Sequence, residues 1–260
     1  MPTFLPPGDN YDPFARFYDL FYAQCDEDIP MYLDFARAAD GAILELGCGS
    51  GRLLLPLAQA GHRVTGLDGS AEMLARARER LRAAGLAEYV TLAHGDLRHF
   101  ELAERFALAI LSVNTFMHCH DTQAQLACLG CVHRHLGSGG RLVVDLTHPD
   151  LPTLAEMDGR LLSDEPVRDP QTGYLVQRFI QQRLDWANQL QHVTFIIDEL
   201  APDGSVRRTL FPFHLRLVFR FEMELLLRLA GFGLEALYGS YHLEPFGSHS
   251  ERMIFVARRD

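Results

Sequence analysis

The run Ala42-Ile-Leu-Glu-Leu-Gly-Cys-Gly-Ser-Gly-Arg52 decides the fold of this chain. An apolar segment that contains one carboxylate, Glu45, stops at Gly47, and glycine recurs two and four residues later. The leucine-rich segment that follows favours a helix. A buried strand that enters a glycine turn and then a helix leaves backbone N–H groups facing a cavity, because residues without a Cβ let a ligand approach closely. The run therefore predicts a nucleotide-binding turn.

The glycine spacing limits which nucleotide this turn can hold. The dinucleotide fingerprint G-x-G-x-x-G would place its third glycine at the position of Arg52, whereas the observed spacing is G-x-G-x-G. Glu45 would repel a pyrophosphate but suits a ligand that carries positive charge or hydroxyl groups. A P-loop requires a lysine, and all 24 basic residues are arginine, which excludes P-loop NTPases and Schiff-base chemistry.

Composition places the chain among ordinary globular proteins. Its 260 residues suffice for one sizeable domain, with or without an insertion, and 48% are apolar. No apolar run reaches membrane-spanning length, and the first residues lack the pattern of a signal peptide. Five irregularly spaced cysteines favour a reducing compartment over a disulfide framework. A net charge of −10 argues against nucleic acid as the main partner. We therefore expect a cytoplasmic protein with neither a membrane nor a nucleic-acid partner.

The segment that follows the turn alternates between helix-like and strand-like patterns. After the strand that leads into the turn, further strands are expected at 62–67, 89–93, 106–112 and 141–146, and helices at 51–61, 70–85 and 121–136. Ser70 is a good N-cap for the second of these helices. An aromatic helix at 11–23 and a short helix at 29–39 precede the turn. Strands alternating with helices form a parallel sheet with crossovers, so we predict a doubly wound, three-layer α/β fold.

The C-terminal part of the chain has a different pattern. Segments 174–184, 191–200 and 206–219 are rich in β-formers and are separated by turn residues, which predicts an antiparallel meander. A helix at 221–231 and strands at 232–238 and 252–257 would complete a seven-stranded sheet. We predict one Rossmann-like domain from 1–150 and 220–260, with a helical cap at 1–40. Residues 151–219 would form an inserted antiparallel β segment.

Acidic residues stand at the expected ends of neighbouring strands. Asp68 closes the second strand, 19 residues after Gly49, where a carboxylate can hold both hydroxyls of a ribose. Asp96 closes the third strand, where it can accept from an adenine amino group, and Leu97 adds a backbone N–H and an apolar wall. Ligands in doubly wound sheets bind beyond the carboxyl ends of the strands. Together with Glu45, these acids predict a nucleoside site around the glycine turn.

The segment Glu45-Leu-Gly-Cys-Gly-Ser-Gly51 resembles the first motif of the class I S-adenosylmethionine-dependent methyltransferases. The resemblance implies S-adenosyl-L-methionine as cofactor and S-adenosyl-L-homocysteine as product, with the methionine end and the ribose over the turn. It also implies that N-terminal tyrosines close over the cofactor, as in small-molecule members of the family. The expected cofactor site comprises Tyr11, Tyr18, Glu45, Gly47, Cys48, Gly49, Arg52, Asp68, Gly69, Met73, Gly95, Asp96, Leu97, Val113 and Asn114.

The chemistry implied by this cofactor needs an oriented acceptor and, for some acceptors, a base. The sulfonium methyl is already activated, so in-line displacement depends mainly on proximity and needs no metal. His118, after the fourth strand, and His148, after the fifth, are the candidate catalytic bases, with His118 preferred, although a packed or surface role is the simpler explanation for any single histidine. We expect no metal site at Cys128-x-x-Cys131, because one helix cannot converge the nearby histidines on these thiols.

The acceptor class is the least constrained feature. Methyltransferases of adenine and cytosine amino groups carry an Asn/Asp-Pro-Pro-aromatic tetrad where this chain has Ser112-Val-Asn-Thr115. The aromatic cap and inserted sheet instead resemble members that methylate the nitrogen or oxygen of small molecules, including amino sugars. In such members the sheet walls the acceptor pocket or forms a homodimer face. Here the pocket could be lined by aromatic residues of the sheet and by Arg178, Arg183 and Arg216, although an outward-facing strand explains each arginine equally well. The alternatives are a binding protein without turnover, a nicotinamide oxidoreductase, and a methyltransferase for protein or nucleic acid.

Overall fold

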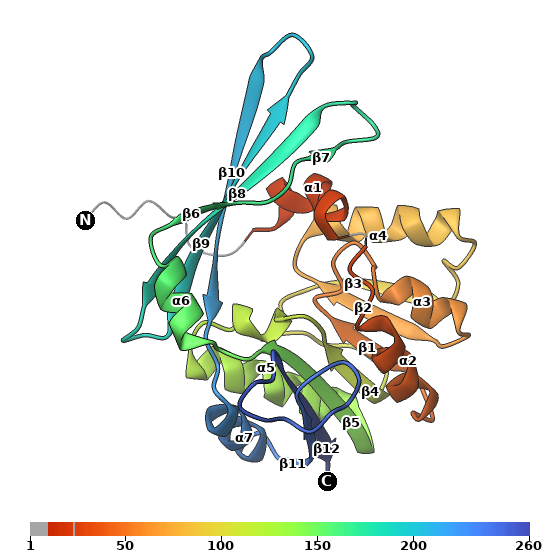
Figure 1. The fold of residues 1–260 in the computed structure, drawn as a ribbon. Coiled ribbons are helices and arrows are strands. Elements are labelled where there is room, and N and C mark those ends of the chain that lie inside the picture. The colour runs from red at the N-terminus through yellow and green to blue at the C-terminus, as the bar shows by residue number, and fades with distance from the viewer. Residues whose placement is uncertain (1–9, 23) are drawn as a thin grey trace.

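A computed structural model describes residues 10–22 and 24–260 of the chain. Its core is a sheet of seven strands (Figure 1). They are β1 (Ile43–Leu46), β2 (Val64–Asp68), β3 (Val90–His94), β4 (Phe106–Leu111), β5 (Leu136–Thr147), β11 (Phe232–Tyr238) and β12 (Arg252–Arg259). Their order across the sheet is β11-β12-β5-β4-β1-β2-β3.

The order and direction of the strands confirm the predicted doubly wound fold. Strand β1 pairs in parallel with β2 on one side and with β4 on the other, so the chain changes winding direction beside β1. Only β12 runs antiparallel to its neighbours β5 and β11. Open α/β sheets bind ligands at this switch point, beyond the carboxyl ends of the strands.

Helices cover both faces of the core sheet (Figure 1). They are α2 (Ile29–Arg37), α3 (Leu54–Gln59), α4 (Ala71–Ala83), α5 (Thr122–His135) and α7 (Arg220–Leu229). Helix α4 begins where predicted, because the Ser70 side chain accepts a hydrogen bond from the Met73 N–H at 3.1 Å. Two apolar clusters lie on the two faces of the sheet, one beneath α2, α3 and α4 and one beneath α5 and α7. None of the described helices combines the length and hydropathy needed to cross a bilayer.

Strand β5 begins five residues earlier than predicted. The glycine-rich segment 137–140 was expected to end the preceding helix, but it continues β5 and shifts its register against β4. Gly139 has a φ of +73°, and a Cβ on Gly140 would lie 3.0 Å from the Gly137 carbonyl and 3.2 Å from the Phe106 carbonyl. The glycines therefore form an irregular strand that approaches its neighbour too closely for a side chain.

A second, antiparallel sheet lies between β5 and α7 in the chain. It contains β6 (Leu161–Ser163), β7 (Val167–Arg168), β8 (Leu175–Asp185), β9 (Leu190–Leu200) and β10 (Val206–Arg216), and helix α6 (Leu151–Met157) precedes it. The main path has the order β10-β9-β8-β6, and β7 pairs with β8. The three long strands match the predicted meander, whereas α6, β6 and β7 were not predicted. The sheet extends away from the core (Figure 1).

Helix α1 (Asp12–Tyr22) joins the second sheet to the core. It matches the predicted aromatic helix; residue 23, the predicted end, lies outside the described residues. Phe14 and Phe17 are buried on one face of α1, against Phe195 and Phe211 of the second sheet and Met73 of α4. In Figure 1, α1 lies between the second sheet and α4. The apolar face of α1 therefore places it above the carboxyl ends of the core strands.

Candidate functional site

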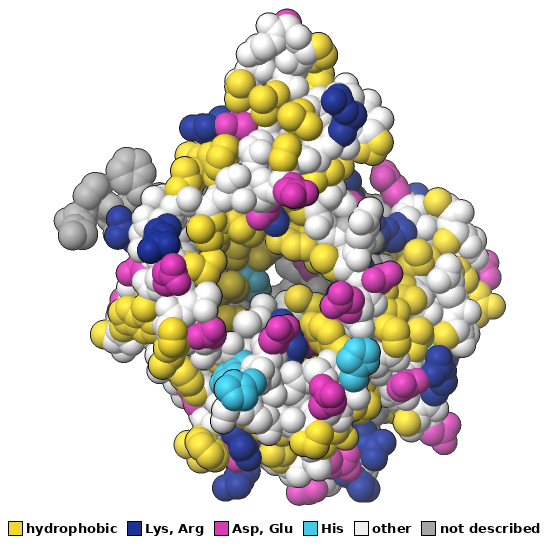
Figure 2. All heavy atoms as spheres, viewed as in Figure 1, with side chains coloured by type: hydrophobic (Ala, Val, Ile, Leu, Met, Phe, Trp, Pro, Cys, Tyr) yellow, Lys and Arg dark blue, Asp and Glu magenta, His cyan; other side chains and the backbone are white. Residues whose placement is uncertain are grey.

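A cavity of about 1000 Å³ lies at the switch point of the core sheet. Figure 2 shows the surface hollowed between the second sheet and the core. The core side of the cavity is lined by Gly47, Gly49, Asp68, Gly69, Ser70, Met73, Gly95, Asp96, Leu97, Val113, Asn114 and Thr115. The opposite side is lined by Tyr11, Phe14, Tyr18, Tyr22, Phe195, Phe213 and Leu215. One wall of the cavity is thus built from strand ends and the other from aromatic side chains.

The glycine turn after β1 presents bare backbone to this cavity. The N–H groups of Gly47 and Cys48 donate to the Leu67 carbonyl at 2.7 and 3.1 Å, which fixes the turn to β2. Gly47 has a φ of +69°, and a Cβ there would lie 2.5 Å from Cγ2 of Thr115. Gly49 has a φ of +53°, and a Cβ there would meet no protein atom within 4 Å. Gly47 is therefore required by packing, whereas Gly49 keeps the cavity open.

The Asp68 carboxylate is held at the end of β2 by two backbone donors. Its Oδ2 accepts from the Gly49 N–H and its Oδ1 from the Ser70 N–H, each at 2.8 Å. Burial raises the pKa of Asp68, and the two N–H groups oppose that shift. Each oxygen keeps a further lone pair, so the carboxylate can still accept from a ligand hydroxyl.

Asp96 lines the cavity at its more exposed end. Arg98 pairs with both carboxylate oxygens of Asp96, and its Nε lies 2.8 Å from Oδ1 and 3.1 Å from Oδ2. Hydrogen bonding from the Arg98 side chain lowers the pKa of Asp96. The expected base-recognition residue therefore lies at the cavity, but it already carries a charged partner.

Glu45 lies outside the cavity lining, contrary to our expectation. Its side chain is buried in the core sheet, with Oε1 3.5 Å from Oγ of Ser112 and Oε2 without a hydrogen-bond partner among the described residues. Burial raises the pKa of Glu45 to about 8. Cys48 is likewise buried and outside the lining. Glu45 stays within the sheet, whose two faces are covered, and Cys48 packs against β2, with its Sγ 2.9 Å from where a Cβ on Gly66 would lie.

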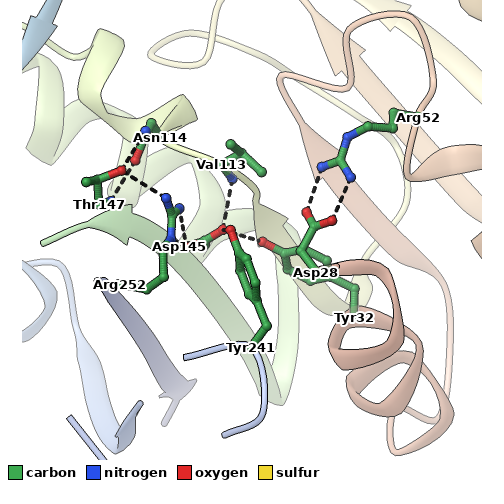
Figure 3. A network of polar contacts seen from close by, with 9 residues as sticks. All are labelled: Asp28, Tyr32, Arg52, Val113, Asn114, Asp145, Thr147, Tyr241 and Arg252. Carbon is green, nitrogen blue, oxygen red and sulfur yellow. Dashed lines mark hydrogen bonds and ion pairs between the residues drawn. The ribbon is translucent and has the colours of Figure 1, made fainter. Parts of the chain in front are cut away.

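Arg52 fastens the loop before α2 to the core. Its guanidinium forms two parallel hydrogen bonds with the Asp28 carboxylate, both 2.6 Å (Figure 3). Nη1 also donates to the Cys25 carbonyl at 2.7 Å. The guanidinium is mostly buried, with 13% of its side chain exposed. Arg52 lines the cavity as expected, but its guanidinium hydrogen-bonds Asp28 and the Cys25 carbonyl.

A buried network that the sequence did not reveal supports the turn after β4. Val113 and Asn114 have φ values of 36° and 65°, an uncommon backbone for these residue types. The Val113 N–H donates to Oδ2 of Asp145 at 3.3 Å, and the hydroxyls of Tyr32 and Tyr241 donate to the same atom at 3.1 and 3.2 Å. Figure 3 shows these three donors, together with Arg252, around the Asp145 carboxylate.

Arg252 completes the network around this turn. Its Nε donates to Oδ1 of Asp145 at 2.8 Å and its Nη1 to Oγ1 of Thr147 at 2.9 Å. Asn114 and Thr147 are joined by two further hydrogen bonds of 2.7 and 3.0 Å (Figure 3). The strained turn is thus fixed by the C-terminal strand, and Val113 and Asn114 are held at the cavity wall.

Comparison with known proteins places this site in a family. A family described as "Methyltransferase domain" matches residues 43–140. The cypemycin N-terminal methyltransferase of Streptomyces sp is 30% identical over 224 residues, 86% of this chain and 85% of that protein. The chain belongs to the class I S-adenosylmethionine-dependent methyltransferases.

Two further similarities agree with this membership. The dTDP-3-amino-3,4,6-trideoxy-alpha-D-glucopyranose N,N-dimethyltransferase of Streptomyces venezuelae is 29% identical over 138 residues, 50% of this chain and 56% of that protein. A solved S-adenosylmethionine-dependent methyltransferase from Clostridium acetobutylicum has the same fold, with a TM-score of 0.80 and 18% identity over 96% of this chain and 98% of that chain. The predicted family, enzyme class and cofactor are thereby confirmed.

The residues of this methyltransferase fit S-adenosylmethionine. Gly49 leaves open a space that any Cβ would enter, and Asp68 offers two oriented carboxylate oxygens beside it. We expect the Gly49 turn to hold the methionine end and Asp68 the ribose hydroxyls; both roles remain predictions. Tyr18 lines the same cavity, and burial raises its pKa to about 12, so it stays a neutral phenol.

The helical cap is attached to the cofactor side of the methyltransferase by carboxylates. Asp19 on α1 accepts from the Ser50 hydroxyl at 2.7 Å and from Arg80 at 2.8 Å. Asp12 accepts from the Ser70 hydroxyl at 2.5 Å. Because Ser50 and Ser70 follow β1 and β2, the cap is positioned by the segments that form the cavity wall.

The two candidate catalytic histidines lie in different places. His118 ends the short 3₁₀ helix η1 (Thr115–His118) and lines the cavity, with Nε2 3.1 Å from the Tyr11 hydroxyl. His148 lies outside the cavity, where its Nδ1–H donates to the Ser250 carbonyl at 2.8 Å and its ring packs on Phe246. The expectation for His148 was therefore wrong, because that carbonyl turns the ring toward the C-terminal loop.

The arginines expected in the acceptor pocket also lie elsewhere. None of Arg178, Arg183 and Arg216 is among the described residues that line the cavity. Arg178 pairs with Asp164 and donates to the Tyr22 hydroxyl at 2.8 Å. Arg216 hydrogen-bonds the segment before β9. The second sheet therefore contributes aromatic and aliphatic side chains to the cavity.

Proposed function

We propose that this methyltransferase transfers a methyl group from S-adenosylmethionine to a nitrogen atom of a small-molecule acceptor. The observation that carries this proposal is the His118–Tyr11 pair on the cavity wall, 3.1 Å between Nε2 and the hydroxyl. An ammonium cannot attack until it has lost a proton, and a histidine is a suitable acceptor for that proton. The names of two relatives, an N-terminal methyltransferase and an N,N-dimethyltransferase, support nitrogen over oxygen.

The chain's own residues would act by positioning and by moving one proton. The sulfonium supplies the activated methyl when the cofactor is bound. Tyr11 fixes the His118 ring through the hydroxyl–Nε2 contact, and Phe213 packs against both rings with centroids 6.0 and 6.4 Å away. The proton that the amine releases would pass to the Tyr11 oxygen as the Tyr11 hydroxyl proton moves to Nε2 of His118. In-line displacement then follows from the proximity of the two bound molecules.

Transfer of an isotope-labelled methyl group tests this proposal. Phenethylamine and phenethyl alcohol share one skeleton, and labelled product is expected only from the amine. His118→Gln keeps the ring's approximate size but removes its basicity, and we expect kcat to fall about 100-fold or more. His148→Gln is the matched control, because that side chain faces away from the cavity. Transfer to the alcohol alone, or an unchanged rate in His118→Gln, would reject the proposal.

We further propose a homodimer formed through the second sheet. Strand β10 ends the main path of this sheet, and it exposes Val206 and Leu210 with 54% and 59% of their surface accessible. An open strand edge with exposed apolar residues favours pairing with a second copy. Light scattering should give twice the chain mass, and a single-chain mass at every concentration would reject this arrangement.

We also propose a reducing, cytoplasmic location. All five cysteines are free, and four of them are buried. Thiols that pack as small apolar side chains are typical of proteins from reducing compartments. Thiol titration of protein purified without reductant should give five free groups after unfolding, and a disulfide would count against this location.

A further inference from the structure

The charged side chains around the cavity are unevenly distributed. Four carboxylates line it, from Glu27, Asp28, Asp68 and Asp96. The described lining contains only two arginines, Arg52 and Arg98. Each arginine is already paired with one of those carboxylates, Arg52 with Asp28 and Arg98 with Asp96. The wall therefore has no excess of fixed positive charge.

The positive charge of each arginine is already balanced by a carboxylate partner. To bind an anionic ligand, Arg52 would have to leave Asp28, whose side chain is only 4% exposed, and an unpaired carboxylate would then remain buried. Arg98 makes a forked pair with Asp96 through Nε and Nη2, so its charge is balanced by that carboxylate. Phosphate groups are usually recognised by arginine forks or helix N-termini with free donors. The cavity contains two arginines, but the guanidinium groups of both already donate hydrogen bonds to carboxylates.

The side of the cavity opposite the strand ends is mostly aromatic, with His118 and His120 beside the aromatic rings. Tyr11, Phe14 and Tyr18 contribute from the α1 side, and Phe195 and Phe213 from the second sheet. Their rings contact one another edge-on or tilted, as in the Tyr11–Phe213 and Phe195–Phe213 pairs, with centroids 6.0 and 4.9 Å apart. Aromatic faces attract cations and pack on apolar bodies, and they offer nothing to a phosphate.

From this charge pattern we infer that the acceptor is a phosphate-free amine carried on an apolar or neutral body. The inference rests on the proposed N-methyl transfer and narrows its substrate class. It separates this chain from the relative whose name specifies a dTDP-linked amino sugar. Asp28 and Asp96 are paired with arginines and Asp68 belongs to the expected cofactor site, so Glu27 is the lining carboxylate left to face an acceptor. A carboxylate there attracts an ammonium and repels a diphosphate. An N-terminal peptide amine and an unphosphorylated amino sugar both have the required chemistry.

Binding to the protein loaded with S-adenosylhomocysteine tests the charge pattern without turnover. The two probes are phenethylamine and thymidine diphosphate, titrated by calorimetry at low and high sodium chloride. We expect the diphosphate to bind about tenfold or more weakly than the amine, and amine binding to weaken with salt. Tighter diphosphate binding that weakens with salt would overturn the inference, as would a failure of the amine to bind at all.

A charge reversal at the rim gives a sharper comparison. Glu27→Arg places an arginine on the lining without breaking either existing pair, so the diphosphate should bind about tenfold more tightly. Asp26→Arg is the matched control, because it makes the same charge change one residue outside the described lining. Equal effects from the two variants would mean that net charge alone governs binding, and the inference would fail.

An activity comparison separates this inference from the proposed function. The acceptors are one amino sugar in two forms, a methyl glycoside and its thymidine diphosphate ester, with a peptide that has a free N-terminal amine as a third. Faster transfer to the glycoside or the peptide supports the inference and shows which source the enzyme uses. Faster transfer to the nucleotide-linked form overturns the inference but leaves N-methylation intact. Transfer to the phenethyl alcohol control and to no amine rejects the proposed function itself.

Discussion

The backbone N–H of Gly49 donates to Oδ2 of Asp68 at 2.8 Å, which joins the glycine turn after β1 to the carboxylate that ends β2. Ser70 donates to the other oxygen at the same distance, so the carboxylate is fixed by two backbone groups. The cofactor therefore meets a carboxylate whose direction is already set, which reduces the entropy lost on binding.

Replacing this carboxylate by an amide should weaken cofactor binding while leaving the fold intact. In Asp68→Asn one carboxylate oxygen becomes an NH₂ donor, which would face a backbone N–H at either Gly49 or Ser70. Hydrogen bonds to charged groups contribute about 1.5–3 kcal/mol, so the Kd for S-adenosylmethionine should rise about 10- to 100-fold. Calorimetric titration measures this change. Asp34→Asn, on the exposed side of α2, is the control and should bind like the wild type.

Two glycine substitutions in the same turn should have different effects. In Gly47→Ala the new Cβ would clash with Thr115, so both the free energy of unfolding and cofactor binding should fall. In Gly49→Ala the methyl group would enter the open cavity, so stability should fall by only about 1 kcal/mol, from the positive φ. Cofactor affinity in Gly49→Ala should nevertheless fall about tenfold or more. Wild-type affinity in Gly49→Ala would show that the cofactor does not contact this turn.

Substitutions in the hydrogen-bond network around Asp145, which supports the turn after β4, should lower the free energy of unfolding. Asp145→Ala would leave the Arg252 guanidinium, with 15% of its side chain exposed, without its main partner, at a cost of about 3–5 kcal/mol. Tyr241→Phe removes one hydroxyl from the same carboxylate and should cost about 1 kcal/mol. Urea unfolding with an unchanged m-value measures both changes. The exposed Tyr89→Phe serves as control, and an equal loss there would contradict this ranking.

The buried Glu45 should make stability depend on pH in the direction opposite to a paired carboxylate. Burial raises its pKa from 4.5 to about 8, so the folded state holds the proton more tightly than the unfolded state. The protonated Glu45 side chain stabilises the folded state fully below its unfolded-state pKa of 4.5, and this contribution is lost as the pH rises toward the folded-state pKa of about 8. Relative to Glu45→Gln, the ligand-free wild type should lose stability between about pH 5 and about pH 8, and the difference should level off above that. A difference in the free energy of unfolding between the wild type and Glu45→Gln that does not change between these pH values would contradict a protonated Glu45.

Local patterns in the sequence were sufficient to predict most of the helices and strands of the core domain. Apolar runs that end in glycine or acid positioned β1 and β2, and the Ser70 cap positioned α4, because these signals lie within a few residues of the element they define. Strands β6 and β7 were missed, since strands of two or three residues carry no measurable periodicity. Helix α6 was missed because none of its seven residues is buried, so it has no apolar face to recognise.

The site was only partly predictable because its contacts are not local. Asp145 meets Tyr241 and Arg252 across 96 and 107 positions of sequence, and no spacing rule connects them. A position near the end of a strand also does not specify which way the side chain points. Glu45 turned into the sheet and His148 toward the Ser250 carbonyl, whereas Asp68 reached the cavity.

The most direct test of the central claim is the mass of the acceptor after incubation with the enzyme and S-adenosylmethionine. With a phosphate-free amine in the presence of wild-type enzyme, mass spectrometry should detect the addition of a methyl group at nitrogen, together with release of S-adenosylhomocysteine. The same product should be nearly absent with His118→Gln and undiminished with His148→Gln. A methyl group found on oxygen, or full methylation by His118→Gln, would contradict the account.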